Sequence, residues 1–226
     1  MSTIHNDVNL VALQKLIIEA DAEIISQPIL DAMYQGSYEY REAHIVSRTL
    51  SANDRVLEIG AGIGFLTCLM AKILQNKETL VSFEASSELI AVIERNLKRN
   101  AVQATIFNGV VSNTCNASED FYFGRDFWSN SVLYQPDARI ISVPNFNFED
   151  LIQQFKPTYL TIDIEGSEHE LLLSSSLNGV QKICLEVHPL HLSSVQMREI
   201  FAHLDCLGFS ADMKLSWGQV FYFEKK

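Results

Sequence analysis

The sequence contains few basic residues, and this scarcity narrows the classes of partner. Of its 226 residues, 17 are Lys or Arg and 28 are Asp or Glu, which gives a formal net charge of −11. Because phosphate contacts require clustered Lys and Arg side chains, this balance disfavours a nucleic-acid partner and favours a small-molecule substrate. No uncharged run is long enough to span a bilayer, and the first residues lack the basic start and apolar core of a signal peptide. We therefore expect a cytoplasmic protein without a membrane partner.

Paired cysteines and linkers are also missing. The four cysteines contain no Cys-x-x-Cys pair, so neither a zinc site nor a disulfide framework is indicated. No internal repeat, low-complexity tract or linker divides the chain. A length of 226 residues with 47 % hydrophobic content therefore fits one compact domain with a substantial core.

Strand and helix patterns alternate along most of the chain. Residues 1–50 are predicted to form a helical cap, because Leu10, Leu13, Leu16 and Ile17 recur at helical spacing and Arg41–Leu50 is a second such stretch. Residues 51–226 are predicted to form the main domain, with repeated strand–helix units and hence a parallel sheet. Strands are predicted at 55–59, 80–83, 104–107, 159–164 and 182–187, and helices at 65–74, 87–97, 168–177 and 194–207.

Two segments depart from the alternation. Residues 115–157 are rich in aromatic residues and turn formers, and we expect a substrate-side insert in which most rings pack a hairpin on the sheet. Within it, Trp128, Ser129 and Asn130 are the predicted substrate contacts. The C-terminal residues 211–217 and 219–224, joined by Gly218, are predicted to form an antiparallel hairpin.

A glycine loop follows the first predicted strand of the main domain. Gly60, Gly62 and Gly64 alternate with other residues, and Glu84 ends the next predicted strand. Glycine allows a sharp turn and close approach of a ligand to the backbone, and an acid about 20 residues further on accepts hydrogen bonds from a ribose diol. The pattern predicts a nucleoside site, although a tight strand-to-helix turn without a ligand would need the same glycines.

The spacing of this loop separates two classes of nucleoside. A dinucleotide fingerprint requires Gly or Ala at the position of Phe65, where the pyrophosphate meets the helix. The spacing Glu-x-Gly-x-Gly-x-Gly, which begins at Glu58, instead resembles the first motif of S-adenosylmethionine-dependent methyltransferases. The resemblance places Glu58 near the ammonium group of that cofactor.

Polar residues end five predicted parallel strands, where open α/β sheets bind their ligands. Besides Glu58 and Glu84, they are Asn108, the pair Asp163 and Glu165, and the pair Glu186 and His188. The members of each pair are two residues apart and project to the same face of the sheet. A buried carboxylate lowers the stability of the fold unless it is paired, hydrogen-bonded or part of a functional site. A histidine at this position could accept a proton near neutral pH, or its ring could simply be hydrogen-bonded at the rim of the sheet.

A metal site at the same strand ends is a further interpretation. Asp163, Glu165, Glu186 and His188 are chemically suited to be its ligands, as in catechol-type methyltransferases. No ligand-spacing motif supports it, however, so the sequence predicts no metal.

The residues from 36 to about 190 resemble the FkbM family of S-adenosylmethionine-dependent methyltransferases. The diagnostic element is the segment Asp163-Ile-Glu165-Gly166-Ser-Glu168, although Thr161 stands where lysine is common. The resemblance implies a Rossmann-like class I methyltransferase fold, with a mostly parallel seven-stranded sheet, an antiparallel C-terminal hairpin and an N-terminal helical cap. Family members are mostly O-methyltransferases of sugars, polyketides and other metabolites.

Site residues follow from the resemblance position by position. The cofactor S-adenosylmethionine would contact Tyr38, Glu39, Glu58, Gly60, Gly62, Gly64, Glu84, Asn108, Gly109 and Asp163. Asp163 and Glu165 would face the sulfonium, with His188 nearby, and these three are the predicted catalytic residues. The base that activates an acceptor hydroxyl is expected to be His188 or Asp163.

Three other functions compete with O-methylation of a small metabolite. An N-methyltransferase needs less help from a base, a non-catalytic cofactor-binding protein transfers no methyl group, and a nicotinamide dehydrogenase binds NADH. The sequence names neither the acceptor nor the oligomeric state.

Overall fold

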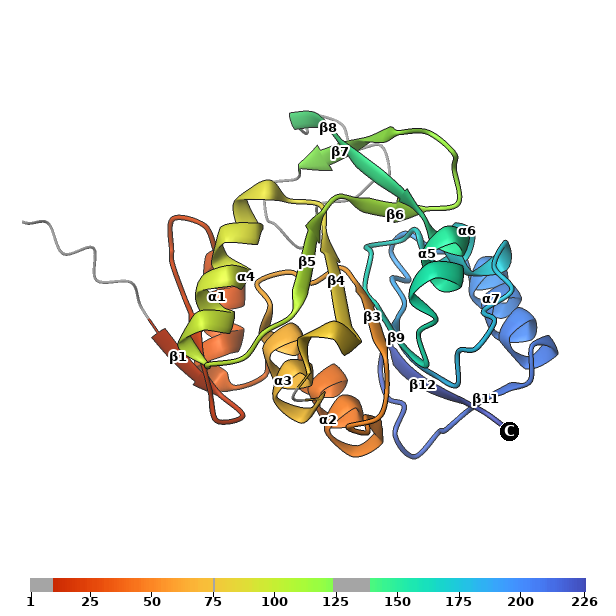
Figure 1. The fold of residues 1–226 in the computed structure, drawn as a ribbon, viewed down its shortest axis with the longest axis horizontal. Coiled ribbons are helices and arrows are strands. Elements are labelled where there is room, and N and C mark those ends of the chain that lie inside the picture. Colours follow the sequence, from red (N-terminus) through yellow and green to blue (C-terminus); the bar gives the residue numbers. More distant parts are fainter. Residues whose placement is uncertain (1–9, 75, 124–138) are drawn as a thin grey trace, which may run out of the picture.

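The computed structural model describes residues 10–74, 76–123 and 139–226, and its centre is one seven-stranded sheet (Figure 1). The four pairings from β10 to β5 are parallel, whereas β12 runs antiparallel to both of its neighbours. The strands, in spatial order, are β11 (Phe209–Ala211), β12 (Val220–Lys225), β10 (Lys182–Glu186), β9 (Tyr159–Ile162), β3 (Val56–Ile59), β4 (Leu80–Glu84) and β5 (Thr105–Asn108). The predicted parallel sheet with a C-terminal antiparallel hairpin is confirmed.

Helices cover both faces of this sheet. On one face lie α1 (Gln27–Gln35), α2 (Tyr40–Thr49), α3 (Phe65–Leu74) and α4 (Ser87–Arg99), and on the other lie α5 (Phe148–Phe155), α6 (Glu168–Leu173) and α7 (Ser194–Cys206). A short 3₁₀ helix, η1 (Lys77–Thr79), leads into β4. Side chains that alternate along a strand serve the two cores in turn: Val56 belongs to the first and Leu57 to the second.

The N-terminal segment is a hairpin, and the prediction of a helix over Leu10–Ile17 was wrong. β1 (Leu10–Leu13) and β2 (Leu16–Glu19) pair antiparallel around Gln14 and Lys15, both of which have positive φ. Burial alternates along both strands, and Ile17 is 46 % exposed although it fits a helical stripe. The hydrophobic spacing suited both periods, and packing on α3 and α4 decided between them.

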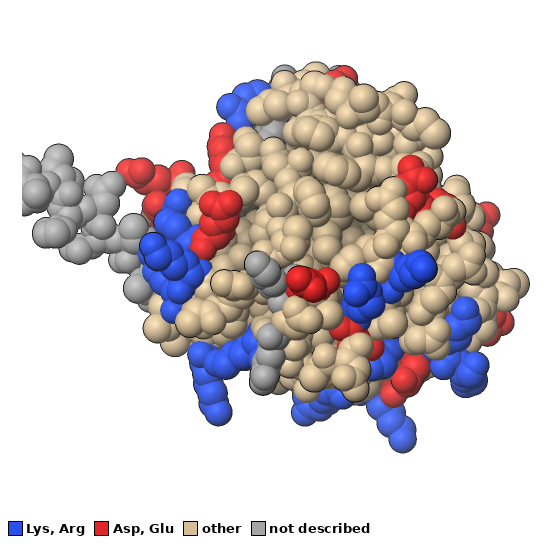
Figure 2. Space-filling view, in the orientation of Figure 1, with Lys and Arg blue, Asp and Glu red and all other residues tan. Residues whose placement is uncertain are grey.

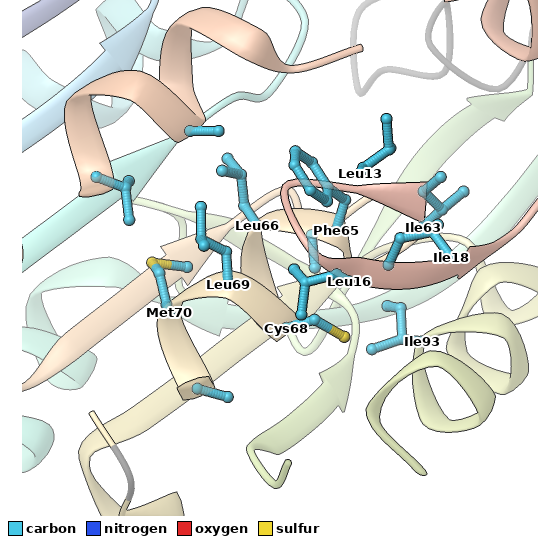
Figure 3. Packing of buried hydrophobic residues seen from close by; sticks show 14 of the residues in the cluster. Leu13, Leu16, Ile18, Ile63, Phe65, Leu66, Cys68, Leu69, Met70 and Ile93 are labelled. Atoms are coloured by element: carbon cyan, nitrogen blue, oxygen red, sulfur yellow. The ribbon is translucent and has the colours of Figure 1, made fainter. Parts of the chain in front are cut away.

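The hairpin completes the first core. Leu13, Leu16 and Ile18 lie against side chains of α3, among them Phe65 and Cys68 (Figure 3). The predicted helix over residues 41–50 is confirmed as α2. The N-terminal cap of the sheet is therefore part strand and part helix.

The described part of the expected insert contributes a helix and two strands of a small three-stranded sheet, whose third strand, β6, precedes residue 115. β6 (Val110–Ser112) pairs parallel with β8 (Arg139–Asn147), which pairs antiparallel with β7 (Ser118–Phe123). Sequence reasoning missed α5, whose first turn is capped by the Asn147 side chain accepting from Asp150 N at 3.1 Å. The 115–157 boundaries of the insert stay a prediction.

Other predicted elements differ in their ends. The first strand of the C-terminal hairpin is Phe209–Ala211 rather than residues 211–217, because the Asp212 backbone and side-chain oxygens accept amides of the following residues and form a turn. Helix α6 ends at Leu173 rather than 177.

Charge on the surface is unevenly placed. In Figure 2, Lys and Arg gather along the lower edge and at the left, whereas the upper part of this face, over β6 to β8, is largely uncharged. Among the described residues, no helix combines the length and apolar composition that crossing a bilayer requires.

Candidate active site

A cavity of about 610 Å³ lies at the carboxyl ends of β3, β4, β9 and β10. The turn between α1 and α2 forms one wall, and Val110, Val111 and Phe121 of the small sheet form another. Open α/β sheets bind ligands at this edge, and the volume is in the range of small-molecule sites. Of the predicted strand-end residues, Glu84, Asp163, Glu165, Glu186 and His188 line this cavity.

The glycine loop sits against the neighbouring strands. The backbone N–H groups of Gly60 and Ala61 both donate to Phe83 O at 3.0 Å. A Cβ at Gly60, where φ is +87°, would lie 1.8 Å from the carbonyl oxygen of Asp163. Only glycine fits there, so the loop passes over the end of β9 with its backbone open to the cavity.

Glu84 lies next to this loop and is the best-defined ligand acceptor. Its Oε2 accepts from Gly62 N and its Oε1 from Ser86 N, both at 2.8 Å. Each carboxylate oxygen keeps a second lone pair, which suits a ribose diol. Burial raises the pKa of Glu84 to about 7, so donors from a ligand would favour its charged form.

Three predicted cofactor residues do not line the cavity. Glu58 is 1 % exposed and accepts from Thr67 Oγ1 at 2.7 Å and from Ser82 Oγ, and burial raises its pKa to about 7. A Cβ at Gly64 would meet Ile93 at 3.0–3.2 Å, so this glycine serves helix packing. The Asn108 amide instead donates to the backbone oxygens of Glu84 and Ala85, both at 2.9 Å.

Three other predicted cofactor residues do reach the cavity. Tyr38, Glu39 and Gly109 all line it, and a Cβ at Gly62 would lie 3.4 Å from the Tyr38 hydroxyl. Glu39 has a φ of +46° at the start of α2, and burial raises its pKa well above the usual value. A Cβ at Gly109 would lie 2.5 Å from Pro144 O, which explains the glycine there by close packing.

The far end of the cavity carries the predicted catalytic residues around His188. Its Nδ1 lies 2.7 Å from Glu168 Oε1, and its Nε2 lies 3.4 Å from Asp163 Oδ1 and 3.3 Å from Glu165 Oε2. Burial alone would lower the pKa of His188, but the hydrogen bond to Glu168 and the charges of Asp163 and Glu165 raise it to about 10. The imidazole is therefore charged at neutral pH in the unliganded protein.

The acids of this group have raised pKa values. Burial raises the pKa of Asp163 to about 6, and burial together with the charge of Asp163 raises that of Glu165 to about 8 and that of Glu186 to about 9. We call Asp163, Glu165, Glu168, Glu186 and His188 the acidic edge. It attracts cations and can exchange protons near neutral pH.

Sequence reasoning missed other wall residues. Glu42 of α2 is 7 % exposed and lines the cavity together with Glu186, and its helical position hid this role. Tyr40 and Trp217, both near 45 % exposed, pack their rings 5.7 Å apart where they line the cavity, with Arg41 over the Trp217 ring. The predicted substrate contacts Trp128, Ser129 and Asn130 lie outside the described residues.

The strand order, with an antiparallel β12 between β10 and the edge strand β11, defines the Rossmann-like class I methyltransferase fold. The model of the protein-L-isoaspartate(D-aspartate) O-methyltransferase family matches residues 9–117, slightly less than half of the chain. Among curated proteins, none matches in sequence.

Solved structures match over nearly the whole chain. TYW2 of M. jannaschii in complex with AdoMet is 13 % identical, with 97 % of this chain and 87 % of that chain covered and a TM-score of 0.51. A methyltransferase from Pyrococcus furiosus is 16 % identical over 95 % and 91 %, with the same TM-score. TYW2 of P. horikoshii in complex with MeSAdo is 13 % identical over 96 % and 69 %, also at 0.51. At these identities the likeness concerns the fold.

Proposed function

We propose that this protein is an S-adenosylmethionine-dependent methyltransferase that acts on a hydroxyl group of a small metabolite. The main observation behind the proposal is that the glycine loop, the hydrogen-bond acceptor Glu84 and most of the acidic edge line the same cavity. Structural neighbours with AdoMet or MeSAdo bound, and the partial match to an O-methyltransferase family, support the choice of cofactor. The resemblance of the segment around Asp163 to the FkbM family favours a metabolite acceptor.

The residues of the cavity fit such a cofactor. Glu84 offers lone pairs to a ribose diol, and Gly60 and Gly62 leave the backbone open where a longer side chain would intrude. Asp163 and Glu165 would face the sulfonium, and its positive charge would lower their raised pKa values and favour their ionised forms. When bound, S-adenosylmethionine supplies a methyl group on a positively charged sulfur, which is already a good leaving group.

The protein's contribution is then positioning and proton removal. An acceptor oxygen forms its bond to the methyl carbon as the sulfur–carbon bond breaks, and the hydroxyl proton passes to the acidic edge. Asp163 is the first candidate base, because its pKa near 6 leaves it ionised at neutral pH. His188 must first lose its own proton, which positive charge bound beside it would promote.

Calorimetric titration tests the cofactor directly. We expect S-adenosylmethionine and S-adenosylhomocysteine to bind wild-type protein, and Glu84→Ala to abolish binding while Glu88→Ala, an exposed acid on α4, leaves it intact. NADH should not bind. Binding of NADH, or of none of the three, would contradict the proposal.

Transfer of a labelled methyl group to pooled hydroxylated metabolites separates the enzyme from a non-catalytic binding protein. His188→Ala is expected to lower turnover by about 10²-fold or more with cofactor affinity unchanged. An N-methyltransferase would instead show a pH–rate profile that follows only the pKa of the acceptor amine.

A further inference from the structure

Asp163, Glu186 and His188 lie at the carboxyl ends of β9 and β10, and each offers one atom that could bind a metal ion. One ligand atom of each lies within 4.8 Å of those of the other two. Ligands opposite one another across a divalent cation are separated by twice the bond length, about 4.2–5 Å for bonds of 2.1–2.5 Å. The three atoms therefore fit around a single ion without rearrangement of the backbone.

His188 is oriented as a ligand. Glu168 Oε1 lies 2.7 Å from its Nδ1 and also accepts from Gly166 N at 3.0 Å, so the carboxylate is fixed and the Nε2 atom points at Asp163. A carboxylate that binds the second ring nitrogen is the usual support of a metal-bound histidine. Glu168 has no exposed surface, so it acts as this support rather than as a ligand from the cavity.

The separations around Nε2 suit neighbouring ligands better than direct hydrogen bonds. Nε2 lies 3.4 Å from Asp163 Oδ1 and 3.3 Å from Glu165 Oε2. Charge-assisted hydrogen bonds are about 2.7–2.9 Å long. Adjacent ligands of a six-coordinate ion lie about 3.0–3.4 Å apart, which is √2 times a bond of 2.1–2.4 Å.

Buried polar atoms beside this set have no hydrogen-bond partner among the described residues. They include Asp163 Oδ1 and the hydroxyl of Thr161, a residue that is 5 % exposed. Thr161, Asp163 and Glu186 line a void of about 10 Å³, which has room for about one water molecule. Buried polar atoms without partners call for an explanation, and an ion with a bound water provides one.

The local charge is also unbalanced. Glu39 and Glu42 line the same void as Asp163 and Glu186, and Arg41 is the only Lys or Arg among the described residues of the large cavity. Carboxylates so close together must share protons or a cation.

We propose that Asp163, Glu186 and His188 bind one divalent first-row cation of the Mn²⁺ type. Two carboxylates and one imidazole suit such an ion better than a thiophilic metal. Only the role of the ion rests on the proposed function: an acceptor hydroxyl bound to the ion would lose its proton more readily. The sequence offered these three residues and Glu165 as possible ligands but had no spacing motif to support a site; the fold supplies the observation that one ligand atom of each of the three lies within 4.8 Å of the others.

Manganese titration followed by electron paramagnetic resonance tests the site. Protein stripped with EDTA is titrated with Mn²⁺, with and without S-adenosylmethionine, because the signal of free Mn²⁺ falls on binding. We expect one equivalent to bind, with affinity reduced at least tenfold in Asp163→Asn, Glu186→Gln and His188→Ala. Matched controls are the exposed His191→Ala and Glu170→Gln, which should bind as wild type.

Circular dichroism verifies that each variant is folded, and broadening of the wild-type His188 ring resonances by Mn²⁺ gives a second measurement that needs no variant. No binding under either condition, or equal affinity in ligand and control variants, would overturn the proposal. Calorimetry with S-adenosylmethionine is scored separately: cofactor binding without Mn²⁺ binding refutes the metal site alone, and the reverse refutes the proposed function alone.

Discussion

Replacing Glu84 by Gln should weaken cofactor binding strongly while leaving the shape of the side chain unchanged. Both carboxylate oxygens accept a backbone N–H at 2.8 Å, from Gly62 and Ser86. An amide has one acceptor oxygen, so its NH₂ group would face one of these donors, and the ribose diol would lose a charged acceptor. An unsatisfied buried donor costs about 1–3 kcal/mol and a hydrogen bond to a charged group contributes about 1.5–3 kcal/mol.

The unpaired donor lowers the stability of the free and the bound protein alike, so the loss in affinity comes from the hydrogen bond to the charged group: about 1.5–3 kcal/mol, or about 10- to 150-fold in Kd. The pH dependence gives an independent signature. Burial raises the pKa of Glu84 to about 7, and the diol needs its ionised form. The ionised fraction falls about tenfold from pH 8 to pH 6, so wild-type Kd should rise about tenfold over that range.

Calorimetry at pH 6, 7 and 8 measures both effects. Glu84→Gln should bind weakly and with a shallower pH dependence, the remainder coming from Asp163, whereas Glu88→Gln should behave as wild type. Wild-type affinity that does not change with pH, or a variant with the wild-type Kd, would refute the role of Glu84 as diol acceptor.

Three further predictions concern stability. Gly60→Ala should lower the free energy of unfolding in urea by about 3 kcal/mol, because the new Cβ would lie 1.8 Å from the carbonyl oxygen at the end of β9. Gly36→Ala should lower it by only about 1 kcal/mol, because Gly36 has a positive φ but no atom lies within 4 Å of the new Cβ. Glu19→Ala removes a buried carboxylate bound to Arg95 at 2.6 Å and should cost about 2 kcal/mol, measured the same way. The unliganded protein should be less stable at pH 8 than at pH 5.5, because the pKa of Glu58 is about 7 in the folded protein and near 4.5 in the unfolded chain. The folded protein therefore holds the proton more tightly, and the free energy of unfolding falls as the pH rises between these two values. Glu58→Gln should make this decrease in stability smaller.

Each of these has a result that would contradict it. Equal costs at Gly60 and Gly36 would mean that strain at positive φ, not the close approach to β9, fixes the loop. A change below about 0.5 kcal/mol for Glu19→Ala would show that the partly exposed arginines regain their full solvation without it. A free energy of unfolding that increases from pH 5.5 to pH 8 would contradict the expectation for a buried carboxyl group whose pKa is raised by folding.

The local part of the site was predictable from the sequence. Gly60 and Glu84 are recognised by spacing because a turn, the helix α3 and the strand β4 fix their separation along the chain. Asp163 and Glu165 were placed at a strand end by the same reasoning, and the structure brings both to the cavity.

Tertiary packing decided what the sequence could not. Leu13 and Leu16 fit a helix and a strand equally well, and only the docking of the hairpin on α3 and α4 selects the strand. Glu58 occupies the motif position expected for a cofactor ligand, yet Thr67 and Ser82 hold it beneath the loop. Its carboxylate supports the strand and helix that frame the glycines.

The acidic edge opposes the stability of the empty protein, and this cost is itself evidence of a ligand. Folding buries Asp163, Glu165 and Glu186 around a single imidazole; burial first, and then the neighbouring carboxylates, raise their pKa values and disfavour their ionised forms. A structural core would replace such groups with apolar side chains of similar size at little cost. A bound cation or sulfonium removes the repulsion, and ligand binding and proton release are therefore coupled. Stabilisation by either ligand must then increase with pH, because more of the edge is ionised and its uncompensated charge is larger in the empty state.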